Sequence, residues 1–195
     1  MEIISWMQIG HVRLNLPREL LNNSQHAYMK GKSTETALHE VVSYIEKSMM
    51  CKDYVLAAFL DIEGAFNNVQ SDSIKKALEF IKVDNDIINW VFNMLTTRTV
   101  YSELGSSSCS KSVSRGTPQG GVISPLLWLL VVNTILKPFE DEGIKVVAYA
   151  DDVVVLVRGK RKFLNTLSEL METALARLHS WTCLNGLGIN PAKQN

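Results

Sequence analysis

The stretch "KVVAYADDVVVLV", Lys145–Val157, decides the fold. Two runs of valine and alanine flank an adjacent pair of aspartates, Asp151 and Asp152. Apolar β-branched runs on either side of a short polar pair are typical of a β-hairpin. A turn accounts for one aspartate, because its side chain can hydrogen-bond its own backbone. The second adds repulsion and desolvation cost unless a cation is near. The stretch therefore predicts an antiparallel hairpin with a candidate metal site at its turn.

A second carboxylate stands at the end of another apolar run, "YVLAAFLD", Tyr54–Asp61. The run predicts a fully buried strand, expected in the middle of the sheet beside the hairpin. Asp61 and Asp151 would then project from neighbouring strand ends. Carboxylates from two strands can hold two Mg²⁺ ions about 3.5–4 Å apart. The alternative is that Asp61 only caps the following turn.

The rest of the chain alternates helical and extended patterns. A helix is expected from Ser33, which would cap it, with an apolar face made of Leu38, Val41, Val42, Ile45 and Met49. Ser124 is expected to cap a helix that has Pro125 at its first position and runs toward Lys137. Further helices are predicted near 72–81, 84–97 and 164–181, and strands near 99–104, 110–113 and 187–191. Because the hairpin makes part of the sheet antiparallel, the predicted class is α+β.

Composition limits the classes of partner. The chain has 195 residues and 46% hydrophobic content, enough for one domain or a large piece of a bigger one. Its 20 basic and 20 acidic residues cancel, so a nucleic-acid partner would have to be held by local patches. "RGKRK", Arg158–Lys162, is a candidate patch, with a solvated loop as the alternative.

Cysteine usage and the apolar runs bear on the compartment. The three cysteines show no C-x-x-C spacing, which argues against a disulfide framework and a zinc site and favours a reducing interior. The N-terminus lacks the basic and long apolar regions of a signal peptide. The most apolar run, residues 122–136, is shorter than the roughly 18–20 residues of a spanning helix. We therefore expect an intracellular protein of cytoplasm and nucleus, with no membrane segment or membrane partner.

A third segment, "SRGTPQGGVISP" at 114–125, lies between the two carboxylate sites. Its glycines let backbone approach a base or sugar, and Gln119 offers both a donor and an acceptor. In this order and spacing, "AFLDIEGAFNNV", "RGTPQGGVISPLLW" and "YADDVVVLV" resemble motifs A, B and C of the reverse transcriptase palm. "QHAYMKGKSTETAL" resembles the segment before motif A in non-LTR retrotransposon polymerases of the insect jockey-like kind, and "GLGINPAK" resembles motif D. The resemblance covers about residues 25–193.

The resemblance implies a fold and a domain layout. Residues 25–195 would form a reverse transcriptase domain, a polymerase palm with a central antiparallel sheet packed by helices and part of the fingers, behind a poorly patterned leader at 1–24. The basic upstream fingers segment and the thumb would be missing. We therefore expect the 195-residue chain to fold marginally on its own and not to copy RNA processively.

The resemblance also implies roles for particular residues. The implied metal-binding aspartates are Asp61, Asp151 and Asp152, with Asp151 the more direct ligand of the motif C pair. The other implied site residues are Ile62 (a backbone ligand through its carbonyl), Phe66 (a steric gate against a 2′-hydroxyl), Gln119 and Gly120 (lining the nucleotide site) and Lys193 (near the leaving pyrophosphate). The cofactor would be two Mg²⁺ ions, with Mn²⁺ as a substitute. The partners would be an RNA template, a DNA primer and deoxynucleoside triphosphates.

Three departures and two rival functions accompany this interpretation. Asn67 stands where the family often has aspartate, and Gln194 and Asn195 stand where threonine and glutamate usually follow the lysine. The predicted function is RNA-directed DNA polymerase. An RNA-templated RNA polymerase is expected to carry another aspartate four or five residues after Asp61, where this chain has Ala65 and Phe66. A truncated, catalytically inactive fragment of a mobile element is the other alternative.

Overall fold

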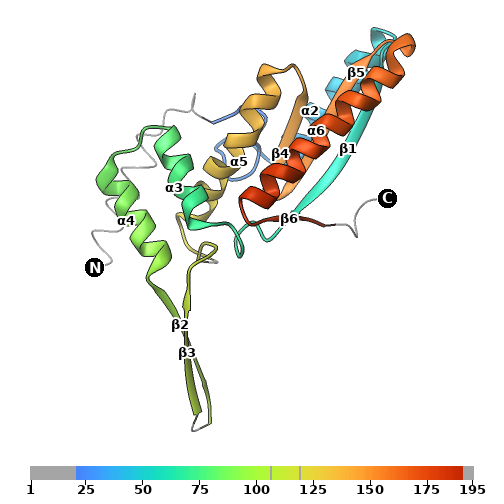
Figure 1. Cartoon of the computed structure of the whole chain (residues 1–195). Coiled ribbons are helices and arrows are strands. Elements are labelled where there is room, and N and C mark those ends of the chain that lie inside the picture. The colour runs from blue at the N-terminus through green and yellow to red at the C-terminus, as the bar shows by residue number, and fades with distance from the viewer. Residues whose placement is uncertain (1–20, 106, 119, 191–195) are drawn as a thin grey trace.

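A four-stranded antiparallel sheet forms the centre of the molecule. The computed structural model describes residues 21–105, 107–118 and 120–190. The strand order is β4-β5-β1-β6 (Figure 1). The strands span Lys145–Tyr149 (β4), Asp152–Gly159 (β5), Tyr54–Glu63 (β1) and Gly188–Ile189 (β6). The predicted α+β class and the predicted hairpin are both confirmed.

Strand β1 lies beside the hairpin, as predicted, but it is not fully buried. Its register with β5 runs from Tyr54 opposite Gly159 to Asp61 opposite Asp152. Only Ile62 of this strand is buried, and Phe59 is 63% exposed. The prediction of a buried strand was wrong because β6 pairs only with the last two residues of β1. Among the described residues, the rest of the outer edge of β1 has no neighbouring strand.

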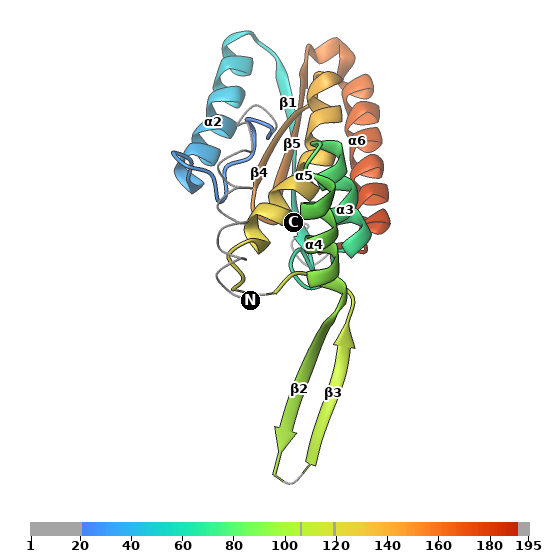
Figure 2. The ribbon, with the colours of Figure 1, turned by 90° about the vertical axis from the view of Figure 1, so that its left-hand side faces the viewer.

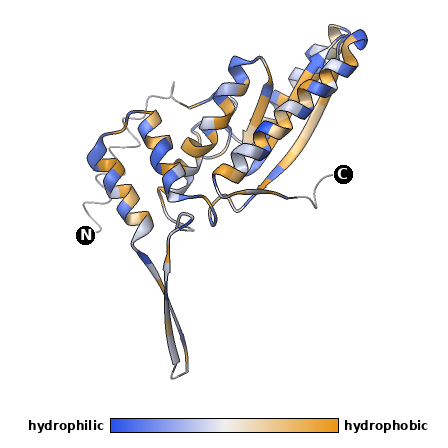
Figure 3. Cartoon of the chain, viewed as in Figure 1, coloured by the Kyte–Doolittle hydropathy of each residue, from blue (hydrophilic) through white to orange (hydrophobic). Residues whose placement is uncertain are grey.

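Helices cover the two faces of the sheet unequally. Helices α5 (Ser124–Asp141) and α6 (Leu164–Leu184) pack on one face, and α2 (Thr34–Met50) packs on the other (Figure 2). Most buried apolar residues belong to the core on the α5 and α6 side. A smaller core joins α2 to the opposite face of the hairpin. The hydrophobic colouring of the strands and of α5 follows this arrangement (Figure 3).

Helix α2 begins as predicted but buries different residues. The Ser33 hydroxyl accepts a hydrogen bond from the Thr36 amide and caps the helix. Of the expected apolar face only Val41 is buried and Ile45 is half-buried. The exposed members are Leu38, Val42 and Met49. The helix instead approaches the sheet closely through Ala37 and Val41, so the larger side chains lie outside the contact.

The predicted cap of α5 was wrong by one residue. Ile123 is the N-cap, and Ser124 is the first residue of the helix. The Ser124 hydroxyl donates to the Pro118 carbonyl at 2.7 Å. It therefore links the preceding glycine-rich loop to the helix and does not accept a hydrogen bond from a free amide at the helix N-terminus.

The remaining elements lie to one side of the sheet or at its far end. Helices α3 (Ser71–Phe80) and α4 (Asn85–Thr96) pack together, and α3 contacts α5. Strands β2 (Arg98–Leu104) and β3 (Ser107–Val113) form a hairpin that projects away from the body (Figure 1). A short 3-10 helix, η2 (Arg161–Phe163), precedes α6. In the described part of the chain, no helix is both long enough and apolar enough to cross a membrane.

The segment before α2 is fixed to the hairpin and to α2. The His26 amide donates to the Ala148 carbonyl at 2.9 Å. The His26 ring is buried and lies 2.8 Å from the Thr36 hydroxyl and 2.6 Å from Glu40. Burial alone would raise the pKa of Glu40, but hydrogen bonds from Lys145 and His26 lower it overall. This network places the following residues, including Tyr28, beside the turn of the hairpin.

Candidate active site

Two carboxylates face each other across the sheet. Asp61 and Asp152 are direct partners in the antiparallel register. Direct partners have Cα atoms about 4.5–5.5 Å apart and side chains on the same face. Both residues line a cavity of about 400 Å³ between α2 and the sheet. The Asp61 carboxylate also accepts a hydrogen bond from Asn190 Nδ2 at 3.1 Å. Like charges in this position repel each other, so the pair favours a cation in the cavity.

Asp151, the expected neighbour of Asp61, lies in the turn next to this pair, and the strand register places Asp152 opposite Asp61 instead. The Ile62 amide donates to its carbonyl at 2.8 Å, which holds the turn against β1. Ala150, the other turn residue, has a φ of 55°, a left-handed conformation uncommon for residues other than glycine. Its carbonyl accepts a hydrogen bond of 2.8 Å from the Trp128 indole. Because both turn carbonyls are hydrogen-bonded, the position of Asp151 is fixed from two sides.

The donor set suits a hard cation that keeps open positions. Among the described residues, no three histidine, cysteine, aspartate or glutamate side chains gather closely enough to hold a metal ion by themselves. A closed zinc site of four protein ligands is therefore not what these residues form. Mg²⁺ is commonly bound by one or two carboxylates, with water and substrate phosphates completing the shell. The facing pair Asp61 and Asp152, with Asp151 beside it, fits that requirement.

Three aromatic side chains connect the turn after β1 with the hairpin. The half-buried Phe66 ring meets Tyr28 edge-on, with ring centroids 6.4 Å apart, and Trp128 at 6.2 Å. Tyr28 has a φ of 57° and is 54% exposed. Burial raises the pKa of Tyr28, and the nearby charge of Asp151 raises it further. The Phe66 ring therefore lies between Tyr28, which is close to Asp151, and Trp128, which donates a hydrogen bond to the turn.

The glycine-rich loop is hydrogen-bonded to the turn that carries Phe66. The Thr117 amide donates to the Phe66 carbonyl at 2.7 Å. Gly116 has a φ of 71°, and a Cβ there would lie 2.5 Å from the carbonyl oxygens of Phe66 and Asn67, so no other residue fits. The buried Thr117 hydroxyl has no hydrogen-bond partner among the described residues. At Gly120 a Cβ would meet no atom within 4 Å, which leaves open space on that side of the loop.

The structure brings some of the predicted site residues together. Asp61 and Asp152 share one cavity, and Asp151 and Phe66 are linked to them through the turn and Trp128. The Ile62 side chain points into the core, being 1% exposed. Gln119 and Lys193 lie outside the described residues. Sequence reasoning missed three residues with contacts to the site, which are Tyr28, Trp128 and Asn190.

The sequence carried no distinct signal for the three missed residues. Trp128 stands in the apolar run that predicts α5, where an aromatic side chain is expected as core. Asn190 stands in the predicted last strand, and no local pattern relates it to Asp61. Tyr28 lies within the segment that resembles the region before motif A, without an assigned role.

Comparison with known proteins agrees with this arrangement. A sequence profile described as "Reverse transcriptase (RNA-dependent DNA polymerase)" matches residues 7–195. The chain belongs to the reverse transcriptase family. Its relatives include the Pol polyprotein from type-1 retrotransposable element R1 of Bradysia coprophila, 32% identical over 80% of this chain and 15% of that protein. The RNA-directed DNA polymerase from mobile element jockey of Drosophila melanogaster is 27% identical over 83% of this chain and 19% of that protein. The predicted resemblance to retrotransposon polymerases is confirmed.

Solved structures support the fold of this member of the reverse transcriptase family. Apo telomerase from Candida tropicalis superposes with a TM-score of 0.63 at 12% identity, covering 98% of this chain and 35% of that one. Telomerase from Candida albicans, with a telomeric RNA fragment, superposes with a TM-score of 0.57 at 10% identity, covering 96% of this chain and 33% of that one. At such low identity the likeness establishes only the palm-type fold. The chain spans about a fifth or less of the length of the two retrotransposon relatives named above.

The bond between Trp128 and the hairpin turn leads to a stability prediction. Trp128→Phe keeps a ring but leaves the Ala150 carbonyl without its indole donor. We expect the free energy of unfolding to fall by about 0.5–1.5 kcal/mol, the net contribution of a typical hydrogen bond, because the Ala150 carbonyl is only half-buried. The Ile62 amide, which donates to the Asp151 carbonyl, should also exchange faster with deuterated solvent. Denaturant unfolding and hydrogen exchange measure the two effects.

Trp181→Phe is the matched control for this variant. Its indole also donates a hydrogen bond, at 2.9 Å, but to the Thr134 hydroxyl of α5 rather than to the turn. It should reduce stability without changing exchange at Ile62 beyond that global effect. If the Ile62 amide exchanges at the same rate in both variants after correction for their stability, Trp128 does not hold the turn in place.

Proposed function

We propose that this reverse transcriptase domain is part of an RNA-directed DNA polymerase that extends a DNA primer on an RNA template during retrotransposition. The observation that carries the proposal is the facing pair Asp61 and Asp152 in one cavity, with Asp151 in the adjoining braced turn. Such a group of carboxylates is costly to assemble without a cation. It matches what nucleotidyl transfer by two Mg²⁺ ions requires.

The residues would act in the reaction as follows. Asp61 and the hairpin aspartates would hold the cations, which when bound would activate the primer hydroxyl and neutralise charge on the transferred phosphate. The oxygen of the primer 3′-hydroxyl forms a bond to the α-phosphorus of the deoxynucleotide, the bond to pyrophosphate breaks, and the hydroxyl proton is released. The Ile62 carbonyl would serve as a further ligand, and Lys193 would stabilise the leaving pyrophosphate, the roles that the family resemblance gives them.

Selection of the nucleotide falls to the turn after β1 and the glycine-rich loop. Phe66 lies five residues after Asp61, the position of the steric gate in the family, and its ring contacts Tyr28 and Trp128. In that role the ring would occupy the space of a 2′-hydroxyl. Gly120 has open space where a side chain would stand, which allows backbone to approach a base. Gln119 would pair with the same nucleotide or with the template base.

A second candidate function is an inactive copy of a mobile element. It is favoured by Asn67, Gln194 and Asn195, which depart from the residues that the family usually carries at those positions. An inactive copy would keep the fold and the nucleic-acid contacts but would not form phosphodiester bonds.

Primer extension distinguishes the two functions. The assay compares the 195-residue chain with a chain extended in both directions along the same reading frame, on RNA and DNA templates with Mg²⁺ or Mn²⁺. We expect the extended chain to add deoxynucleotides on the RNA template and the shorter chain to give at most short products. An extended chain that binds the template–primer but adds no nucleotide with either metal would show an inactive copy.

A further inference from the structure

The end of the molecule opposite the aspartates gathers four segments far apart in the sequence. The end of α2, the start of β1, the end of β5 and the 3-10 helix η2 meet there (Figure 1). Lys160 Nζ lies 2.7 Å from an Asp53 carboxylate oxygen and also donates to the Cys51 carbonyl. The Arg158 guanidinium lies 5.4 Å from the centre of the Tyr44 ring of α2. These contacts make one continuous surface from the four segments.

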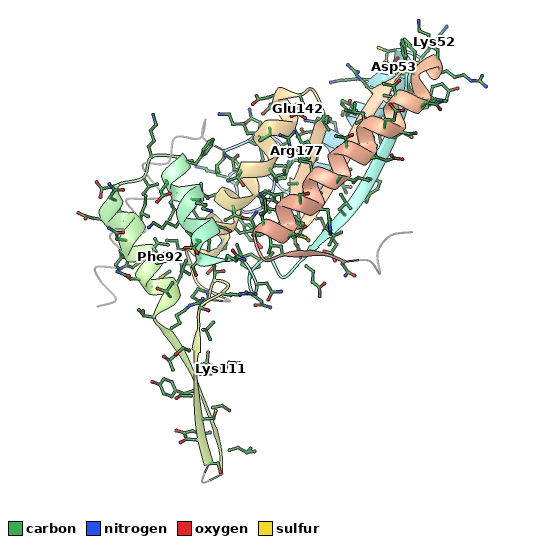
Figure 4. The ribbon with its side chains drawn as sticks, viewed as in Figure 1. Lys52, Asp53, Phe92, Lys111, Glu142 and Arg177 are labelled. Atoms are coloured by element: carbon green, nitrogen blue, oxygen red, sulfur yellow. The ribbon has the colours of Figure 1, made fainter. Side chains whose placement is uncertain are left out.

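This surface is strongly basic. We define the basic end as the six exposed cationic residues Lys47, Lys52, Arg158, Lys160, Arg161 and Lys162. The acidic residues among the same segments are Glu46 and Asp53. Lys52 and Asp53 stand at the tip of the molecule (Figure 4). Because the whole chain has a formal net charge of zero, this excess of positive charge is segregated at one end.

Most of this charge is not neutralised within the protein. Lys160 is the member of the basic end that forms an ion pair among the described residues, with Asp53. Arg158 and Lys162 lie over the rings of Tyr44 and Phe163, contacts that leave their charge in place. Exposed cations concentrated in this way raise the local density of anions and match a polyanionic partner.

The basic end lies at a definite distance from the facing aspartates. Strands β1 and β5 run antiparallel from Tyr54 opposite Gly159, at the basic end, to Asp61 opposite Asp152. Seven residues at about 3.3 Å each give a separation of roughly 23 Å. At the B-form rise of about 3.4 Å per phosphate along a strand, this distance corresponds to about seven nucleotides, and to slightly more in an A-like RNA–DNA hybrid, whose rise is shorter.

We propose that the basic end binds the phosphate backbone of the template–primer about seven nucleotides away from the reacting terminus. The identity of the bound nucleic acid rests on the proposed function, whereas the binding itself does not require catalysis. Lysine and arginine contacts to phosphate fix position without reading sequence. The basic end therefore strengthens binding of any sequence that is long enough to reach it.

Quantitative binding to RNA–DNA hybrids tests this proposal with the chain as it is. The variant Lys52→Gln/Arg161→Gln/Lys162→Gln removes three charges that take part in no ion pair among the described residues. The matched control Lys76→Gln/Lys82→Gln/Lys137→Gln removes three exposed charges on the side of α3 and α5. Fluorescence anisotropy is recorded across a salt series with hybrids of about 16 and about 5 base pairs, lengths that do and do not span the seven-nucleotide distance.

We expect the slope of log affinity against log salt for the longer hybrid to fall by about two to three in the basic-end variant. Its affinity for that hybrid at low salt should drop at least about tenfold relative to the control. The shorter hybrid cannot contact the aspartates and the basic end at the same time, so the basic-end variant should lose less affinity for it than for the longer hybrid. Circular dichroism confirms that both variants keep the fold of the parent.

Several outcomes would overturn the proposal. The first is a salt slope of the basic-end variant for the longer hybrid that equals the slope of the control variant. The second is an equal loss of affinity for the longer and the shorter hybrid, which would contradict the distance inferred between the aspartates and the basic end. The third outcome concerns a membrane, because the apolar side chains of Met50 and Phe163 are exposed beside the basic end. Loss of binding to anionic phospholipid vesicles without any change toward the hybrids would assign the surface to a membrane. Lack of primer extension would count against the proposed polymerase function and leave these binding results valid.

Discussion

Asp61→Asn or Asp151→Asn abolishes primer extension on an RNA template in a chain extended in both directions along the reading frame. Each change removes a negative charge from the carboxylates that would hold the cations, so charge on the transferred phosphate is no longer neutralised. We expect single-nucleotide incorporation to fall at least about 100-fold, equivalent to about 2.7 kcal/mol of barrier. Binding of the template–primer should persist, because it depends mainly on backbone phosphate contacts.

Stability provides an independent measurement for the same variants. In the parent, Asp61 faces Asp152 directly, so Mg²⁺ should raise the melting temperature by relieving their repulsion. Asp61→Asn removes that repulsion, keeps an oxygen for Asn190, and should melt at a temperature independent of Mg²⁺. Asp141→Asn, an exposed position at the end of α5, is the matched control and should leave extension unchanged. Retention of more than about a tenth of the activity by either site variant would refute the metal assignment.

The hairpin and its neighbour could be predicted because their signals are local. Two apolar β-branched runs around a polar pair favour a hairpin with few alternatives. The apolar run that ends at Asp61 was then expected beside a strand of the hairpin, because that pairing brings Asp61 close to the hairpin aspartates. The register, with Asp61 opposite Asp152, follows once both strands are placed. The caps are less certain from sequence, since Ser33 caps α2 whereas Ser124 became the first residue of α5.

Burial was harder to predict because it depends on what covers each residue. An apolar pattern indicates which side chains favour a core but not which neighbours reach them. Phe59 stays exposed because it lines the open cavity between α2 and the sheet and because β6 pairs only with the end of β1. Leu38 stays exposed because α2 contacts the sheet through Ala37 and Val41. Neither cause can be read from the segments themselves.

The supporting residues of the site could not be predicted for a related reason. Asn190 bonds Asp61 across 129 residues of sequence, and Trp128 reaches Ala150 from a helix that reads as ordinary core. Such contacts arise only when the sheet and helices are assembled. Resemblance to a family places residues that carry chemistry, whereas the residues that hold them in position depend on the packing of this particular chain.

Phe66→Val lets ribonucleotides compete with deoxynucleotides. The ring of Phe66 contacts Tyr28 and Trp128, and these contacts restrict its movement away from an incoming 2′-hydroxyl. Replacing it with valine leaves a space of about the size that a hydroxyl needs. We expect the ratio of kcat/KM for a deoxynucleotide to that for its ribonucleotide to fall at least about tenfold, the lower end of what steric selection supplies. Steady-state incorporation of each nucleotide by the extended chain measures this ratio.

The ratio is the informative quantity because Phe66→Val also removes packing from the core. Loss of stability lowers the active fraction, but both nucleotides are measured with the same preparation, so that loss cancels. Phe80→Val trims a ring that is 59% exposed and should leave the ratio unchanged. Tyr28→Ala removes one of the two supports and should lower the ratio less than Phe66→Val, because the ring remains but gains freedom to move. An unchanged ratio in Phe66→Val, together with reduced stability, would identify Phe66 as a core residue that packs Tyr28 against Trp128 and takes no part in choosing the sugar.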